Sequence, residues 1–249
     1  MVDFDKIWVE KYRPKTLSDI ILDNRTLEII KEFKDEIPNL LFVGNPGTGK
    51  TTLAQIIVND ILKCNYLYIN ASDESGIDTI RHNITNFAQT KSFDGKVKVV
   101  ILDEADGLTT QAQSALRNTM ETYAKYCRFV LTANYKHKII PALQSRCQAL
   151  DIKPVVESAV KRCYNILKNE NITVPEEQKK KFIQLVKRHF PDLRKTINEL
   201  QKNIIDSELC IVSVTGDSEL LEAIYKKIAS KNSLEARRYL IENEDRFQG

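Results

Sequence analysis

Apolar and polar positions follow two different patterns along the first 152 residues. Longer stretches such as 50–63 and 111–125 repeat apolar residues at helical spacing. Between them, strand-like apolar runs occur at residues 39–44, 66–70, 98–104, 128–134 and 147–152. Apolar strands that alternate with helices indicate a parallel sheet covered on both faces. We therefore predict one α/β domain over residues 1–152.

The pattern changes after residue 152. Three amphipathic helices are predicted at 153–172, 175–190 and 193–205, and prolines punctuate them. No strand pattern alternates with these helices, so we predict a separate, small, all-helical domain over residues 153–212. Residues 213–249 indicate one or two further helices.

Composition narrows the class of protein without selecting a function. Residues 1–152 carry 19 basic and 19 acidic side chains, and the rest of the chain carries 18 and 15, so the net charge of +3 gives no argument for nucleic acid. No apolar run approaches the roughly 20 residues that span a bilayer, and the N-terminus has no apolar signal segment. The five cysteines are scattered and form no CxxC pair. We expect an intracellular protein with reduced cysteines, no zinc site and no membrane contact.

A glycine-rich loop follows the first predicted strand and opens a helix. The stretch GNPGTGKT (44–51) matches the phosphate-binding pattern GxxxxGKT in the right context, which disfavours a chance glycine loop. Its backbone N–H groups and the following helix N-terminus would face phosphates. Lys50 would reach the β- and γ-phosphates, and the Thr51 hydroxyl would bind Mg²⁺. The candidate nucleotide-binding residues here are Gly44, Asn45, Pro46, Gly47, Thr48, Gly49, Lys50, Thr51 and Thr52.

Polar residues end two of the later strands. Asp103 and Glu104 close the apolar run of residues 98–104, and Asn134 closes the run of residues 128–134. In a parallel sheet these ends meet at the carboxyl edge, where ligands bind. We predict that Asp103 helps to hold Mg²⁺, that Glu104 polarises the attacking water, and that Asn134 contacts the γ-phosphate and that water.

Seven motifs together resemble the AAA+ ATPases, and among them the clamp-loader subunits of the replication factor C small-subunit family, phage and viral counterparts included. They are WVEKYRP (8–14), GNPGTGKT (44–51), NASDESGIDTIR (70–81), LDEAD (102–106), SALRNTMETY (114–123), SRC (145–147) and FPDLRKTINEL (190–200). They cover about 200 residues in the family order. The resemblance implies a P-loop ATPase domain at 1–152, a helical lid at 153–212 and the start of a truncated helical collar at 213–249.

The resemblance also implies further nucleotide contacts. Val9 and Arg13 are candidate ATP contacts from the N-terminal motif, and Tyr12 would shape the same pocket. Arg194 matches the second-sensor arginine, which would project from the lid onto the γ-phosphate. From the residues alone, the favoured interpretation of Arg194 is an exposed helix arginine, because the surrounding stretch 187–195 is basic.

Contacts with DNA are implied at two places. Thr79 and Arg81 lie at the start of a helix that follows the duplex backbone in clamp loaders, and Thr109 with Thr110 would add a weaker contact. The family often has a basic residue where this chain has Ser75. Such contacts to phosphates would be independent of base sequence and sensitive to salt.

The implied function is an ATP-dependent sliding-clamp loader subunit with ATP and Mg²⁺ as cofactors. Its implied partners are other clamp-loader subunits in a pentameric ring or spiral, a sliding clamp and primer–template DNA, at sites of replication. Two alternatives remain. Another DNA-associated AAA+ ATPase, of branch-migration helicase or origin-loader type, would need its own DNA-binding appendage. A non-catalytic subunit would not need an intact set of Lys50, Asp103, Glu104 and Arg146.

Arg146 lies between a predicted short helix, residues 137–145, and the last strand. About seven helical residues would carry the chain roughly 10 Å from the edge marked by Asn134. Arg146 would then miss the γ-phosphate of its own subunit. We therefore predict that it acts in trans, as an arginine finger at the neighbouring subunit's site.

Overall fold

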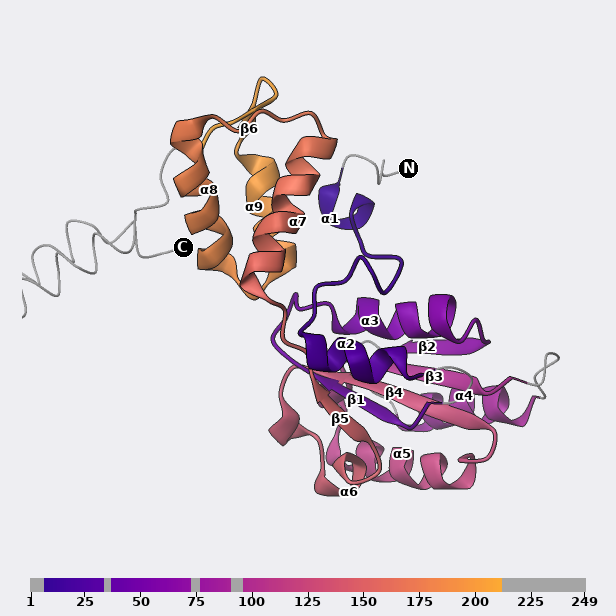
Figure 1. Cartoon of the computed structure of the whole chain (residues 1–249). Coiled ribbons are helices and arrows are strands. Elements are labelled where there is room, and N and C mark those ends of the chain that lie inside the picture. Colours follow the sequence, from indigo (N-terminus) through magenta and orange to yellow (C-terminus); the bar gives the residue numbers. More distant parts are fainter. Residues whose placement is uncertain (1–6, 34–36, 73–76, 91–95, 212–249) are drawn as a thin grey trace, which may run out of the picture.

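The fold is described from a computed structural model, which covers residues 7–33, 37–72, 77–90 and 96–211, without the side chains of residues 77–81. Its main feature is a five-stranded, fully parallel sheet (Figure 1). The strands are β1 (Leu40–Val43), β2 (Tyr66–Asn70), β3 (Lys98–Asp103), β4 (Cys127–Ala133) and β5 (Gln148–Asp151), in the spatial order β2-β3-β4-β1-β5. The predicted parallel sheet is confirmed.

Helices cover both faces of this sheet (Figure 1). On one face lie α2 (Asn24–Lys31), α3 (Lys50–Ile56) and the π-helix η2 (Ile57–Ile61). On the other face lie α4 (Ile77–Gln89), α5 (Thr110–Thr122) and α6 (Pro141–Gln144). The central strand residues are fully buried between these two apolar clusters, as expected for strands that are apolar on both sides.

Two predicted helices differ from the structure. The helix expected over 50–63 changes from α to π geometry at Ile57. The helix expected over 137–145 is wrong: a 3-10 turn, η4 (Lys136–Lys138), precedes an α6 of only four residues. Pro141 begins α6, since proline fits the first helical turn and cannot continue a helix from Ile139 and Ile140.

The second structural unit contains α7 (Val156–Asn169), α8 (Glu176–His189) and α9 (Leu193–Lys202). A small antiparallel hairpin, β6 (Ile204–Ile205) and β7 (Glu208–Leu209), follows them. The prediction of an all-helical unit missed this hairpin. Asp206 and Ser207 form its turn with positive φ angles of 48° and 63°, which suit a tight hairpin but leave little sequence signal without glycine.

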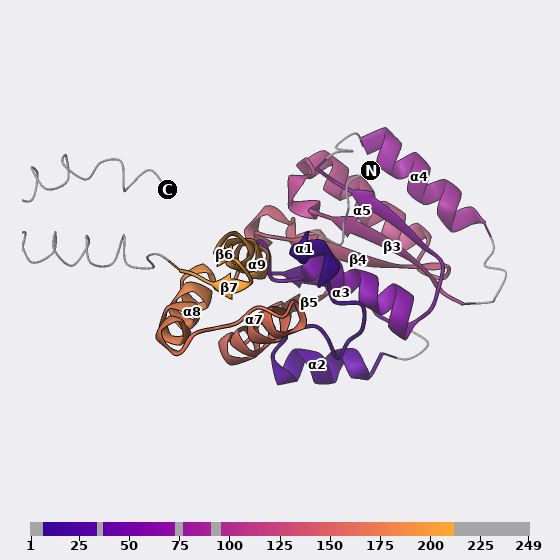
Figure 2. The same ribbon diagram turned by 90° about the horizontal axis from the view of Figure 1, so that it is seen from above.

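The N-terminal segment packs with this helical unit, although it precedes the sheet in the chain. Helix α1 (Trp8–Lys11) lies beside α9, on the side of the helical unit that faces α3 (Figure 2). Trp8 and Ile21 are buried in the same apolar cluster as Ile166 and Leu200, whereas Ile20 is buried in the α2–α3 cluster beside the sheet.

One half-buried arginine joins this segment to α7. Arg162 donates to the backbone carbonyl of Tyr12 at 2.8 Å and to that of Asp19 at 2.7 Å. Tyr12 in turn donates its hydroxyl to Glu170 at 2.6 Å. Burial, followed by the hydrogen bond to Glu170, raises the pKa of Tyr12 to about 12. The N-terminal segment is thereby fixed against the helical unit.

Some predictions fall outside the described residues. The collar-like helices expected over 213–249 are among them, and so is Ser75. Across the helices that the structure does describe, none is both long and apolar enough to cross a membrane.

Candidate functional site

The glycine loop, residues 44–51, connects β1 to α3 and is shaped by two glycines in the left-handed region. Gly47 has φ +73° and Gly49 has φ +94°, angles that side chains rarely adopt. The backbone N–H groups of Gly47, Thr48 and Gly49 make no hydrogen bond to any residue that the structure describes. Three free donors in succession, directly before a helix N-terminus, form a site for an anion.

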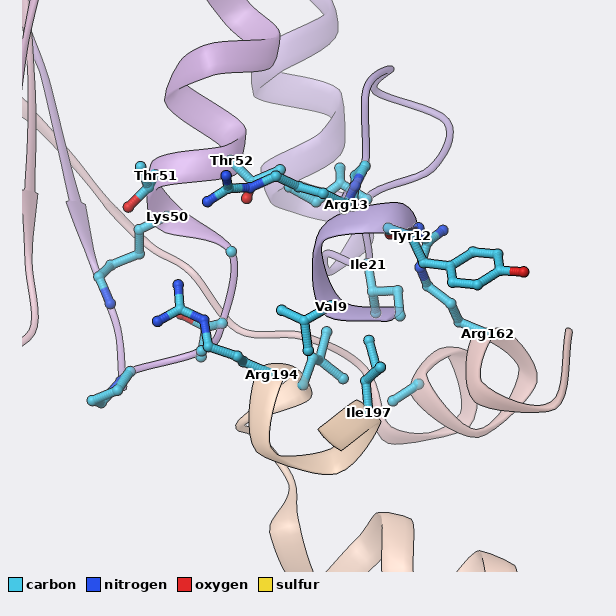
Figure 3. Close-up of a pocket in the computed structure, with 18 of the residues that line it drawn as sticks. Val9, Tyr12, Arg13, Ile21, Lys50, Thr51, Thr52, Arg162, Arg194 and Ile197 are labelled. Carbon is cyan, nitrogen blue, oxygen red and sulfur yellow. Dashed lines mark hydrogen bonds between the residues drawn. The ribbon is translucent and has the colours of Figure 1, made fainter. Parts of the chain in front are cut away.

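Lys50 is buried inside this loop (Figure 3). Its Nζ donates to the carbonyl oxygens of Gly44 at 2.8 Å and Asn45 at 2.9 Å, and to Asn134 Oδ1 at 2.8 Å. Burial lowers the pKa of Lys50, and nearby carboxylates, that of Asp103 first, oppose this only in part. Three oxygen acceptors thus hold the ammonium group between the loop and the end of β4.

Asp103 ends β3 and is almost fully buried. Its Oδ1 accepts hydrogen bonds from Thr132 at 2.6 Å and Thr51 at 2.8 Å. Its Oδ2 accepts from Tyr68 at 2.8 Å and from Thr51 at 2.9 Å. Burial, followed by the hydrogen bond to Asp103, raises the pKa of Tyr68, so its hydroxyl remains a donor. The carboxylate is held by hydroxyl groups on all sides.

Glu104 leaves the strand by turning into the left-handed region, with φ 55°. Its N–H donates to Thr132 Oγ1 at 3.0 Å, and Ser72 Oγ donates to its Oε2 at 2.6 Å. Unlike Asp103, Glu104 is exposed. The turn therefore separates two adjacent carboxylates, one buried and hydrogen-bonded, the other open to solvent.

Asn134 directly follows β4 at the same edge of the sheet. Asp106 Oδ2 accepts from the backbone N–H groups of Asn134 and Tyr135, each at 3.2 Å. Asp106 lies in the 3-10 turn η3 (Ala105–Gly107) that follows Glu104. This contact fixes the end of β4 to the end of β3, and so places the Asn134 amide beside Lys50.

The helical unit and the N-terminal segment complete a pocket over the glycine loop (Figure 3). Arg194, at the start of α9, points toward the loop, and Val9 and Ile197 form an apolar wall. The Leu193 N–H donates to the Gly47 carbonyl at 3.2 Å, so the two units touch directly at this point.

The structure brings most of the sequence-predicted residues to this one pocket. Its lining includes Val9, Tyr12, Arg13, Pro46, Gly47, Thr48, Gly49, Lys50, Thr51, Thr52, Asp103, Glu104, Asn134 and Arg194. Gly44 and Asn45 stand behind it, and their carbonyls hold Lys50. Arg13 forms an ion pair with Glu10 at 3.2 Å.

Arg146 lies outside the pocket lining. Its Nη1 donates to the Ala142 carbonyl at 3.1 Å, and its Nη2 forms an ion pair with Glu121 of α5. The side chain is 36% exposed on the flank of the domain. An exposed ion pair of this kind contributes little to stability, so breaking it would cost little.

The four candidate DNA contacts are placed only in part. Thr109 caps α5 by accepting from the Ala112 N–H at 3.2 Å, and both Thr109 and Thr110 are exposed. Thr79 and Arg81 lie in the first turns of α4, but their side chains are outside what the structure describes.

Sequence reasoning missed several residues that hold the site together: Tyr68, Thr132, Asp106, Ser72 and Arg162. Thr132 had a signal, because it is a polar residue that directly follows three apolar strand residues. Tyr68 had none, since tyrosine is common in strands.

The donor set suits magnesium better than a softer metal. Thr51 and Asp103 offer oxygen ligands, and Mg²⁺ is held by one or two such protein groups together with phosphates and waters. Within the described ranges, no group of three or more His, Cys, Asp or Glu side chains could hold a metal ion by itself.

Comparison with known proteins agrees with this geometry. The model for the ATPase family associated with various cellular activities (AAA) matches residues 40–154. The model for the sliding-clamp-loader large subunit, AAA+ ATPase lid domain, matches residues 151–209. The replication factor C small subunit of Archaeoglobus fulgidus is 39% identical over an alignment of 249 positions, which covers 94% of this chain and 77% of that protein.

This chain belongs to the replication factor C small-subunit family. The small subunit of Methanococcus maripaludis is 41% identical over 234 residues, which cover 91% of this chain and 70% of the relative. Replication factor C subunit 3 of Saccharomyces cerevisiae is 42% identical over 202 residues, which cover 78% of this chain and 58% of the relative. The chain is accordingly a clamp-loader ATPase subunit, and its AAA domain is a nucleotide-binding domain.

Solved structures show the same fold at lower sequence identity. A single-substitution variant of RuvB from Thermotoga maritima superposes with a TM-score of 0.62 at 19% identity. The match covers 77% of this chain and 64% of the RuvB chain. This likeness concerns the fold alone, whereas the family is given by the sequence relatives.

Proposed function

We propose that this protein binds and hydrolyses ATP to open a sliding clamp and load it onto primer–template DNA. The observation that carries the proposal is the pocket in which the glycine loop, the acidic end of β3 and Arg194 of the lid meet. Because Arg194 belongs to the lid and Lys50 to the sheet domain, a triphosphate between them would link the positions of the two units.

The proposed reaction is transfer of the γ-phosphoryl group to water. The water oxygen forms a bond to the γ-phosphorus while the bond to the β–γ bridging oxygen breaks, and ADP keeps that electron pair. Glu104 is exposed and accepts the proton of the attacking water. Lys50, Asn134 and Arg194 stabilise charge on the phosphate oxygens, and rate enhancement comes mainly from such positioning and charge.

Magnesium would be held by Thr51 and Asp103, the two oxygen donors beside the loop. When bound, it would supply positive charge to the β- and γ-phosphate oxygens. The hydroxyls of Thr132 and Tyr68 orient this carboxylate without adding a second cation.

Arg146 completes the site of an adjacent subunit in this proposal. It is exposed on the flank, away from its own pocket, and Glu121 holds it there in the single chain. Ordered contacts between neighbours in a pentameric ring or spiral would bring the guanidinium to the next γ-phosphate. Hydrolysis would then depend on assembly with other clamp-loader subunits.

The proposed DNA interface lies at the N-terminal ends of α4 and α5. Thr79, Arg81, Thr109 and Thr110 would contact the phosphate backbone of a duplex, at replication sites inside the cell. The relatives described above are replication factor C subunits at about 40% identity, which favours clamp loading over an alternative role as a branch-migration helicase or origin loader.

The decisive test measures ATP hydrolysis by this chain assembled with its partner subunits. Four conditions are compared: the assembly alone, with primed DNA, with a sliding clamp, and with both. We expect stimulation to be largest with both together. Lys50→Ala serves as a control for background hydrolysis. A rate that does not respond to the clamp would refute the loading function and leave only a DNA-associated ATPase.

A further inference from the structure

Tyr68 touches the candidate magnesium site from an unexpected direction. It lies on β2, at the edge of the sheet, and the residue is 40% exposed. In the β2–β3 register, Asn70 stands opposite Asp103, so Tyr68 stands two residues earlier on the same face of the sheet. From there its hydroxyl reaches Asp103 Oδ2 at 2.8 Å.

The hydrogen bonds of Asp103 come from three separate elements. β2 and β4 flank β3, and each supplies one hydroxyl to a different oxygen: Tyr68 to Oδ2 and Thr132 to Oδ1. Thr51, from α3, contacts both oxygens. A carboxylate has about four lone-pair positions, so these contacts leave it almost no freedom to rotate.

These three hydroxyls would not have equal roles once an ion is present. Thr51 is itself a candidate ligand, so its oxygen must turn a lone pair toward the ion. The orientation of Asp103 would then depend on Tyr68 and Thr132, whose hydroxyls donate to the carboxylate from the two strands on either side of β3. A neutral phenol also leaves the carboxylate its full negative charge, which a lysine or arginine at this position would offset.

We propose that Tyr68 is a positioning residue for magnesium, which holds the Asp103 carboxylate in the orientation that the ion requires. This inference rests on the proposed function, in which Thr51 and Asp103 hold Mg²⁺. Partners of this kind, which orient a metal-binding carboxylate, typically contribute about 10-fold to 100-fold in metal affinity.

The test substitutes Tyr68→Phe, which removes the hydroxyl and keeps the partly exposed ring. Tyr66→Phe is the matched control: Tyr66 lies on the same face of β2, is 38% exposed, and its hydroxyl bonds no described residue. For each protein, the Kd of a fluorescent ATP analogue is measured with excess Mg²⁺ and with EDTA. The Kd in EDTA divided by the Kd with Mg²⁺ reports the coupling between ion and nucleotide.

For Tyr68→Phe we expect this ratio to fall by about tenfold or more relative to the unmodified protein, with the Kd in EDTA unchanged. Tyr66→Phe should retain the full ratio, and so should Thr132→Ser, which keeps the second hydroxyl. An unchanged or larger ratio in Tyr68→Phe, or an equal loss in Tyr66→Phe, would overturn the inference. If the unmodified protein itself gains no affinity from Mg²⁺, the proposed function fails instead.

Discussion

The contact between the glycine loop and the lid can be tested by adding one methyl group. A Cβ at Gly47 would lie 1.9 Å from Asp192 Oδ1 and 2.4 Å from Asp192 Cγ, far inside van der Waals contact. The φ angle of +73° would also place alanine in the left-handed region. Gly47→Ala should therefore push α9 away from the loop.

The cost can be worked out from these two effects. The left-handed backbone costs about 1–2 kcal/mol for a residue with a side chain. If α9 moves away, the Leu193–Gly47 hydrogen bond is lost as well, at about 1 kcal/mol. Gly47→Ala should therefore lower the free energy of unfolding by about 2–3 kcal/mol.

A second substitution separates the steric effect from the backbone effect. Asp192 caps α9 through the Lys195 N–H, so Asp192→Ala alone should cost about 1 kcal/mol. It also removes the two atoms that clash. The double variant should therefore be about 1 kcal/mol more stable than the sum of the single effects, because the hydrogen bond from Leu193 survives.

Trp8 provides the readout for this cycle. It is the single tryptophan of the chain and is buried in the lid cluster, so its fluorescence during denaturant unfolding reports the lid. Additive effects, within about 0.3 kcal/mol, would show that Gly47 and Asp192 do not touch in the free protein. The apposition of lid and loop would then be wrong.

Two further predictions use other parts of the structure. Arg146→Ala should leave ATP binding by the substituted subunit near normal but slow hydrolysis at the adjacent site by about a thousandfold; subunit mixing checks this, and normal, concentration-independent hydrolysis by the isolated variant would contradict it. Asp23→Ala, which removes the cap of α2, should cost about 1 kcal/mol at pH 7 in denaturant unfolding. Burial raises the pKa of Asp23, but the hydrogen bonds from Thr26 outweigh this and lower it below 3.8. Because the pKa of Asp23 is lower in the folded than in the unfolded protein, its carboxylate stabilises the fold fully above the unfolded-state pKa, and this stabilisation is lost as the pH falls through the folded-state pKa. The difference in unfolding free energy between the unmodified protein and Asp23→Ala should therefore shrink below about pH 4. A difference that stays constant with pH would argue against the cap.

The local motifs were predictable because their geometry follows from chain order. A glycine loop between a strand and a helix has few possible shapes, and the carboxyl ends of parallel strands share one edge. Lys50, Asp103 and Asn134 therefore meet where the pattern predicts. Their nucleotide contacts remain predictions that the proposed experiments address.

Contacts between distant segments were not predictable in the same way. No sequence periodicity indicates that Arg162 donates to the carbonyls of Tyr12 and Asp19. Nor does any pattern indicate that Tyr68 of β2 donates to Asp103. The hairpin turn at Asp206 and Ser207 lacks the glycine that normally marks such turns. The short α6 could have been predicted, since Pro141 favours the start of a helix over its interior.

The packing of the N-terminal segment has a mechanical consequence. Trp8 belongs to the lid core, whereas Leu17 and Ile20 pack with the sheet domain, although Ile21 is again buried in the lid core. Over the described residues the chain therefore passes between the two units once between Tyr12 and Leu22 and again between Ile152 and Val155. A body attached by one crossing can swing about many axes, whereas two crossings restrict it to rotation about the line that joins them. The lid is therefore a discontinuous domain with one preferred axis of motion, and a lid fragment beginning at residue 153 would need residues 8–21 as a complementing peptide to complete its core.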